Sequence, residues 1–271
     1  MMFELKEIIL EQLKHRTQIL KLTIYNMKSE YANHYLGLFW NIIQPVMQLM
    51  IYFVVFGLGL RGGGDRLIDG VPFLLYLVTG VFSWLFISQG INAGSSAILS
   101  NIGLLSKMKF PPSVFISIVL TNKIINLLFT TSLILIVSIF NDLVPLWHYL
   151  YFFYFLFCSL ILIYAISLLT SVLVVVIRDT KNLLSNFIRM CFFLTPIFWS
   201  ANEAHDLLQV ISNLNPFAYL LGIYRFAFIY GDLNAFGTIV DHLYFWVLTI
   251  TLLIIGSIVH HHFKKHLIDY I

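Results

Sequence analysis

Long stretches without a single Asp, Glu, Lys or Arg constrain this chain more than any other feature of its sequence. They cover residues 31–60, 70–106, 143–177 and 242–263. Two further stretches, 110–141 and 182–202, are each interrupted by one charge, Lys123 and Arg189. Only 11% of the 271 residues are charged, against about 25% in an ordinary soluble domain. A water-soluble fold of this size could not bury so much apolar surface, so the sequence indicates a membrane protein.

The apolar stretches are long enough to cross a bilayer. The hydrocarbon core takes about 20 apolar residues in helical form. Trimmed at turn and polar signals, the stretches predict six transmembrane helices, at about 39–60, 73–97, 113–140, 149–177, 183–199 and 243–260. Helices are required because an open sheet edge would leave backbone groups unpaired in lipid. The predicted fold class is an all-α integral membrane protein with six transmembrane helices.

Positive charges are distributed unequally between the two sides of these spans. Eleven fall on one side: Lys6, Lys14, Arg16, Lys21, Lys28, Lys107, Lys109, Arg178, Lys181, Lys264 and Lys265. Three fall on the other: Arg61, Arg66 and Arg225. The positive-inside rule therefore predicts a multi-pass protein of the cytoplasmic membrane with both termini in the cytoplasm. The formal net charge is only +3, so no nucleic-acid partner is predicted.

The chain divides into a short preface and one membrane domain. Residues 1–34 are predicted to form a cytoplasmic amphipathic interface helix and its lead-in, and residues 35–271 the six-span domain. The apolar face of the interface helix comprises Leu5, Ile9, Leu13, Leu20 and Ile24. Such a helix lies along the inner membrane surface, either as an anchor alone or in contact with a cytoplasmic partner as well. Residues 207–224 are apolar but interrupted, which favours extracellular re-entrant or surface helices before the last span.

A short cytoplasmic segment between the second and third spans is both basic and apolar. The residues with docking chemistry are Asn101, Leu104, Leu105, Lys107, Met108, Lys109 and Phe110. The apolar side chains could fill a groove on a soluble partner, while the lysines select its acidic rim. The alternative is a tight inside loop whose lysines only obey the topology rule.

Two charges lie within predicted spans, where a charge is costly enough to suggest a function. Lys123 either snorkels to the cytoplasmic surface or faces a cavity. Arg189 either snorkels inward or faces a water-filled path, where it could pair with a diphosphate. Phe192, Phe193 and Trp199 follow it in an aromatic cluster. These aromatics either belong to the interfacial belt or line an exit for sugars.

Motifs for catalysis or metal binding are missing from the sequence. His260, His261 and His262 are adjacent, so their side chains diverge on a helix, and no metal site is predicted. No glycine-rich phosphate loop is present, so the chain alone is not predicted to be an enzyme or to bind a cofactor. An intramembrane transferase acting on lipid-linked sugars remains an alternative, with Asp179 as its candidate carboxylate. A secondary transporter is disfavoured because no broken helices occur in matching halves.

Several motifs resemble those of a known family of exporters. They are Y-L-G-L-F-W at 35–40, F-G-L-G-L-R-G at 56–62, S-K-M-K-F-P at 106–111, L-T-P-I-F-W at 194–199 and N-L-N-P at 213–216. Over nearly its whole length the chain resembles the permease subunits of polysaccharide-exporting ABC transporters. The second and third motifs look like those of the teichoic acid translocation permeases of Gram-positive bacteria. Pro112 stands where O-antigen exporters often have arginine.

The resemblance implies a mechanism and a set of partners. It implies a homodimer that binds two copies of a separate ABC ATPase subunit, which holds the ATP and Mg. Residues of about 99–111 would form the coupling helix in the ATPase groove. The cargo would be wall teichoic acid on undecaprenyl diphosphate, admitted between the first and fifth spans, with O-antigen or capsule as the alternative polymer. The candidate substrate path comprises Arg189, Phe192, Phe193, Trp199 and Lys123.

Overall fold

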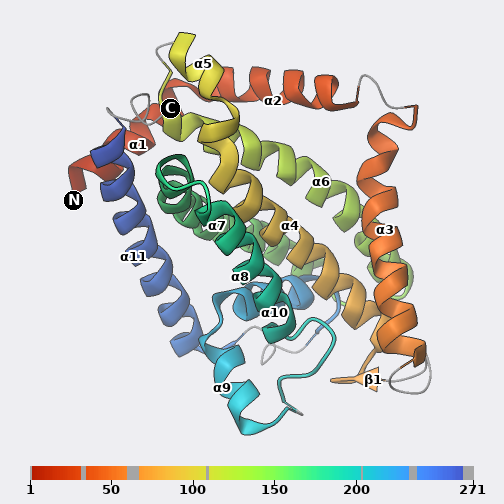
Figure 1. Cartoon of the computed structure of the whole chain (residues 1–271). Helices are drawn as coiled ribbons and strands as arrows, with labels where there is room; N and C mark the ends of the chain where they lie inside the picture. Colours follow the sequence, from red (N-terminus) through yellow and green to blue (C-terminus); the bar gives the residue numbers. More distant parts are fainter. Residues whose placement is uncertain are drawn as a thin grey trace.

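The chain is described by a computed structural model that covers residues 2–31, 35–59, 67–107, 110–202, 204–231 and 237–264. In these residues the chain is almost entirely helical, and most helices run between two ends of one bundle (Figure 1). The elements are α1 (Met2–Lys14), α2 (Arg16–Tyr31), the 3-10 turn η1 (Gly37–Phe39), α3 (Trp40–Tyr52), its π-helical continuation η2 (Phe53–Gly59), β1 (Leu67–Ile68), β2 (Val71–Pro72), α4 (Phe73–Ser100), α5 (Ile102–Lys107), α6 (Pro112–Phe140), the 3-10 turn η3 (Leu146–Leu150), α7 (Tyr151–Val176), α8 (Thr180–Leu194), α9 (Asp206–Leu214), α10 (Pro216–Phe228) and α11 (Ile239–Phe263).

Four helical stretches of the described chain are long and apolar enough to cross a membrane. They are α4, α6, η3 with α7, and α11. They confirm the predicted spans at 73–97, 113–140, 149–177 and 243–260, with ends that differ by a few residues. The protein is therefore a multi-pass helical membrane protein.

The predicted count of six spans is not confirmed by the described residues. The first predicted span is an apolar helix of only Trp40–Phe56, with Pro45 inside α3. The fifth is α8, which has 15 residues and ends before Pro196. Proline disfavours helical backbone in the residue before it, and Thr195 is accordingly extended, with φ −91° and ψ 138°. At 1.5 Å per residue, α8 reaches only about 22 Å, less than the roughly 30 Å hydrocarbon core.

Helices α4 and α7 form the centre of the bundle, while α6 and α11 expose most of their surface. Small residues allow the close approach of the central helices. A methyl group at Gly94 of α4 would lie 2.1 Å from Ser167 Oγ of α7, and one at Gly256 of α11 would lie 2.9 Å from the Ala165 carbonyl oxygen. Small residues at such contacts let helix backbones pack closely in lipid, where no hydrophobic force drives helices together.

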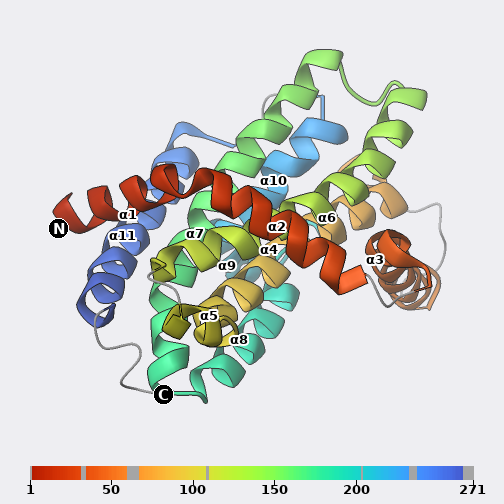
Figure 2. The ribbon, with the colours of Figure 1, turned by 90° about the horizontal axis from the view of Figure 1, so that it is seen from above.

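The N-terminal segment lies across one end of the bundle as two helices (Figure 2). The sequence suggested one helix, but α1 and α2 meet at His15. Helix α1 packs on α6 and α11, and α2 packs on α6. Ile8 and Thr23 are buried against the bundle, whereas Leu13, on the predicted apolar face, is 61% exposed. Most of the predicted face is thus left free for lipid, as an amphipathic helix in the membrane interface requires.

The opposite end carries a hairpin and two short helices. Strands β1 and β2 pair antiparallel, with Leu67 opposite Pro72 and Ile68 opposite Val71. The turn residues Asp69 and Gly70 have φ of 48° and 78°, as an Asp-Gly type I′ turn requires. Re-entrant or surface helices were expected before the last span. Of the helices found there, α9 lies at the same end as the hairpin (Figure 1), and α10 is largely buried against α4 and α7.

Candidate functional site

Helix α5 joins α4 to α6 at the same end of the bundle as α1 and α2 (Figure 1). Asn101 sets the direction of this connection. Its side-chain amide donates to the Ala97 carbonyl at 2.8 Å, and its own carbonyl accepts from the amides of Leu104 and Leu105, each at 3.0 Å. Asn101 therefore stabilises the turn between α4 and α5, and both its side-chain amide and its backbone carbonyl form hydrogen bonds within that turn.

The predicted docking residues do not all face outward. Leu104 is 42% exposed and is available to a partner, but Leu105 is only 8% exposed and packs into the core. The expectation that Leu105 fills a partner's groove is therefore corrected, because the side chain is already used inside the bundle. Lys107 ends α5, and its side chain lies outside the described part, as do Met108 and Lys109.

Phe110 connects this segment to the N-terminal helices. Its ring meets the ring of His15 edge to face with 4.9 Å between centroids, and lies 5.4 Å from the ring of Phe115 in α6. His15 is the residue at which α1 ends and α2 begins, and its Nδ1 lies 2.7 Å from Gln18 Oε1. A partner that moves Phe110 would thus act directly on the joint between α1 and α2.

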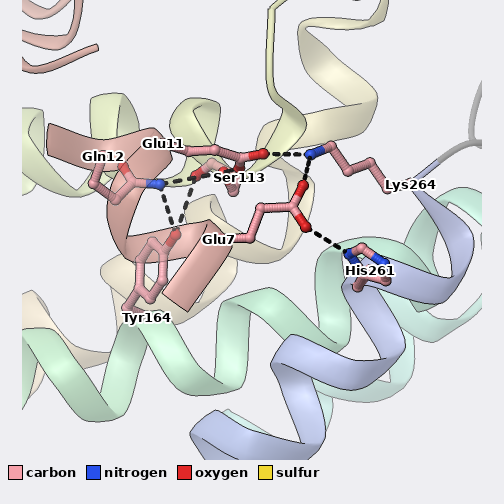
Figure 3. A network of polar contacts seen from close by, with 7 residues as sticks. All are labelled: Glu7, Glu11, Gln12, Ser113, Tyr164, His261 and Lys264. Atoms are coloured by element: carbon pink, nitrogen blue, oxygen red, sulfur yellow. Dashed lines mark hydrogen bonds and ion pairs between the residues drawn. The ribbon is translucent and has the colours of Figure 1, made fainter. Parts of the chain in front are cut away.

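Helix α1 is tied to the end of α11 by ion pairs (Figure 3). Lys264 Nζ donates to Glu7 Oε1 at 2.9 Å and also to Glu11, while His261 Nδ1 lies 3.1 Å from Glu7 Oε2. The hydrogen bond from Lys264 lowers the pKa of the Glu7 carboxyl from 4.5. Burial favours the neutral Lys264 amine, but hydrogen bonds to Glu11 and Glu7 outweigh it and raise its pKa from 10.5. The stability that Glu7 contributes is present above the ordinary carboxyl pKa of 4.5 and is lost as pH falls through its lowered pKa. The stability that Lys264 contributes is present below the ordinary amine pKa of 10.5 and is lost as pH rises through its raised pKa.

Polar contacts on the other side of α1 reach α6 and α7. Gln12 Nε2 donates to Tyr164 Oη at 3.0 Å and to Ser113 Oγ at 3.2 Å, and its Oε1 accepts from Ser117 Oγ at 2.7 Å. Ser113 also donates to Glu11 and stands three residues after Phe110. We call the whole set the α1 anchor: Glu7, Glu11, Gln12, Ser113, Ser117, Tyr164, His261 and Lys264. It fixes α1 to three membrane helices next to the segment that begins with α5 and ends at Phe110.

Lys264→Met is expected to release α1 from α11. The change leaves Glu7 and Glu11, which are four residues apart on one helix, as neighbouring like charges without the lysine that both contact. A hydrogen bond to a charged group contributes about 1.5–3 kcal/mol, so amide exchange across α1 should become about 10- to 100-fold faster. Hydrogen–deuterium exchange on the full chain measures this directly. Lys21→Met removes an exposed charge of α2 and should leave α1 unchanged; equal exchange in the two variants would contradict the role of the anchor.

Four of the five predicted path residues gather around the second half of α8. Arg189 and Phe193 are exposed and one helical turn apart. Phe192 is buried on the other face, with its ring 5.9 Å from that of Trp84. Trp199 donates its indole N–H to the Phe193 carbonyl at 3.2 Å. An arginine beside an exposed aromatic face is thus available here to an anion or a sugar.

Lys123 lies elsewhere, in a small cleft between α3, α4 and α6. Gln44, Gln89 and Asn126 line the same cleft, whose volume is about 40 Å³. The cleft places polar side chains near a charge that lies within a membrane helix. It does not join the α8 cluster, so the five residues do not form one continuous lining in the described chain.

Arg225 is a functional candidate that the sequence interpretation treated only as an outside charge. Its side chain is 4% exposed, and Nη1 donates to the Pro196 carbonyl at 2.8 Å. Nη2 donates to the carbonyls of Ile197 and Tyr76 at 3.0 and 3.3 Å, and Cζ lies 3.5 Å from the centroid of the Tyr76 ring. A charge inside the apolar run of α10 was the signal that could have found it. Arg225 clamps the turn after α8 to the start of α4.

The fold and these contacts define a class of protein: a multi-pass membrane protein with a short connecting helix and two anchored helices at one end. The chain belongs to the ABC-2 type transporter family, which matches residues 17–229. It is 24% identical over 223 residues to the O-antigen export system permease protein RfbA of Myxococcus xanthus, covering 82% of this chain and 84% of that protein. Two proteins of the same name from Klebsiella pneumoniae are 24% and 25% identical over 217 residues, covering 79% of this chain and 80% of each relative. Family membership implies a transporter subunit that is not itself catalytic and that works with an ATPase partner.

Proposed function

We propose that this chain is the membrane subunit of an ABC exporter that carries a lipid-linked polysaccharide across the bacterial cytoplasmic membrane. The observation that carries the proposal is the family match over residues 17–229, together with relatives that are named O-antigen export permeases. The multi-pass helical bundle supports it, because cargo of this size needs a protein path through the hydrocarbon. In this proposal both termini are cytoplasmic, at the end where α1, α2 and α5 lie.

Energy for export comes from a separate ATPase in this proposal. Two copies of the chain bind two ATPase subunits, which hold ATP and Mg. Leu104, Lys107, Met108, Lys109 and Phe110 provide the docking surface. The contact between Phe110 and His15 supports a mechanical role for this surface, since it joins the docking segment to α1 and α2. Movement of α1 is then transmitted to α6, α7 and α11 through the α1 anchor.

The cargo in this proposal is a polysaccharide on a polyprenyl diphosphate such as undecaprenyl diphosphate. The relatives favour an O-antigen-like polymer over the wall teichoic acid that the sequence motifs suggested. Wall teichoic acid remains the second candidate, because the motifs at 56–62 and 106–111 resemble that branch. Arg189 is the proposed contact for the diphosphate, since a guanidinium binds phosphate oxygens in a bidentate manner. Phe193 and Trp199 are the proposed contacts for sugar rings.

The proposal is tested by purifying the chain with and without its ATPase. The chain alone should hydrolyse no ATP, whereas the complex in proteoliposomes should hydrolyse ATP and move lipid-linked polymer across the bilayer. Mass spectrometry of lipid retained by the complex identifies the polymer: a neutral glycan supports the O-antigen type, and a polyol phosphate supports teichoic acid. If the chain alone modifies a polyprenyl-linked sugar without any ATPase, it is a transferase and the proposal fails.

A further inference from the structure

A large, partly open cavity with both polar and apolar groups in its lining lies at the end of the bundle opposite to the α1 anchor. It is lined by the β1–β2 turn, the segment after α8, and helices α9, α10 and α11. Its volume is about 610 Å³, within the roughly 300–1,000 Å³ typical of small-molecule sites. None of the residues predicted for the substrate path lines it. The cavity therefore needs its own explanation.

The wall of the cavity carries a buried arginine whose terminal nitrogens are already engaged. Arg225 lines the cavity, is 4% exposed, and uses Nη1 and Nη2 on backbone carbonyls. Its Nε is buried away from the cavity surface. Arg225 therefore fixes the shape of the wall, and a ligand has to bind through the polar groups beside it.

Carboxylates and phenols complete the lining. Asp69 is held by Ser200, whose Oγ donates to Oδ1 at 2.7 Å, and Asp241 caps the start of α11 through Thr238. The carboxylates are thus fixed before any ligand arrives. Tyr76, Tyr219 and Tyr230 bring aromatic rings with polar tips to the same cavity. Such rings stack on apolar faces while their hydroxyls form hydrogen bonds.

Gly222 keeps the cavity open from the side of α10. Glycine inside a helix costs about 0.5–1 kcal/mol relative to alanine, and is usually explained by a close contact. At Gly222 there is none: an added Cβ would meet nothing within 4 Å. The missing side chain therefore preserves space in the cavity. Together with the two fixed carboxylates in the lining, this space points to an occupant.

We propose that this cavity binds a neutral sugar residue of the exported polymer on the side where the polymer leaves. The proposal rests on the proposed function and adds the class of sugar to it. Sugar hydroxyls donate to the fixed carboxylates, while a sugar ring packs on the tyrosines. Among the described residues, one arginine and two aspartates give the lining a net charge of −1. An anionic polyol-phosphate chain is repelled by that excess of carboxylate, whereas an uncharged hexose is not.

The test compares two probes on the full chain in complex with its ATPase in lipid nanodiscs. A neutral mannose tetrasaccharide should bind in isothermal titration calorimetry, and a glycerol-phosphate tetramer should bind at least tenfold more weakly. Gly222→Phe fills the cavity and should weaken tetrasaccharide binding at least tenfold. Gly231→Phe is the matched control, because Gly231 also has open space around it but does not line the cavity. It should bind as the wild type does.

A second variant keeps the test informative if Gly222→Phe does not fold. Asn213→Ala removes an exposed amide that lines the cavity and should weaken tetrasaccharide binding several-fold. The proposal is overturned if the wild type binds no tetrasaccharide, if the glycerol-phosphate probe binds more tightly, or if neither variant weakens binding. ATP-driven export measured in the same preparations separates the two ideas. Export without tetrasaccharide binding leaves the proposed function standing and removes only this site.

Discussion

The double variant Lys107→Glu, Phe110→Ala is expected to lose ATP-driven export almost completely while still inserting into the membrane. Reversing the charge of Lys107 would place a carboxylate against the acidic rim proposed for the ATPase groove. This removes a charge-assisted contact worth about 1.5–3 kcal/mol. Truncating an aromatic anchor at an interface typically costs more than about 1 kcal/mol. Together these losses of roughly 3–5 kcal/mol correspond to a docking constant about 150- to 5,000-fold weaker.

Loss of docking is best measured by copurification with the ATPase and by stimulated ATP hydrolysis in proteoliposomes. Phe110→Ala alone should keep part of the affinity but uncouple hydrolysis from export, because the ring also contacts His15. Lys181→Glu makes the same charge change on an exposed residue at the start of α8 and should leave export intact. Normal export by the double variant would rule out the segment before α6 as the docking surface.

Arg225→Met is expected to have the largest effect on stability. The change removes the three hydrogen bonds to the carbonyls of Pro196, Ile197 and Tyr76. A hydrogen bond to a charged group contributes about 1.5–3 kcal/mol, so the loss of three should total at least about 3 kcal/mol. For a chain of this size that corresponds to a fall in Tm on the order of 10 °C.

Thermal unfolding of the purified chain in detergent measures this fall. Arg189→Met is the matched control, since Arg189 is exposed on α8 and its loss should shift Tm by only about 1–2 °C. Arg225→Lys should recover little, because an ammonium group cannot reproduce the planar fork that binds several carbonyls at once. An Arg225→Met variant as stable as Arg189→Met would show that the clamp does not hold the turn after α8.

The sequence predicted the long membrane helices well, because their main requirement is a run of about 20 apolar residues. Helices α4, α6, α7 and α11 coincide with four predicted spans. The first and fifth predicted spans are not confirmed, because the corresponding described helices are shorter, and the reasons are local. The π-helical stretch η2 replaces regular α-helix after Tyr52, and α8 ends before Pro196. An apolar composition does not report where backbone geometry changes.

The candidate site was predictable in position but not in detail. The basic, apolar segment after α4 located the connecting helix, yet a helix of six residues has too few turns for periodicity to show that Leu105 faces the core. The α1 anchor had no local signal, because Glu7 and Lys264 are 257 residues apart. Arg225 was overlooked for a related reason. Counting the positive charges on each side of the membrane does not show which of these side chains are buried.

The joint between α1 and α11 has a consequence for how the chain comes apart. Chain ends usually fray first, since they have the fewest neighbours. Here α1 and the end of α11 are joined by the ion pairs of Lys264 with Glu7 and Glu11, so two segments far apart in the sequence stabilise one another. Neither helix can detach without breaking these contacts and so weakening the hold on the other. Protection of α1 from proteolysis should therefore depend in part on an intact end of α11, and the reverse.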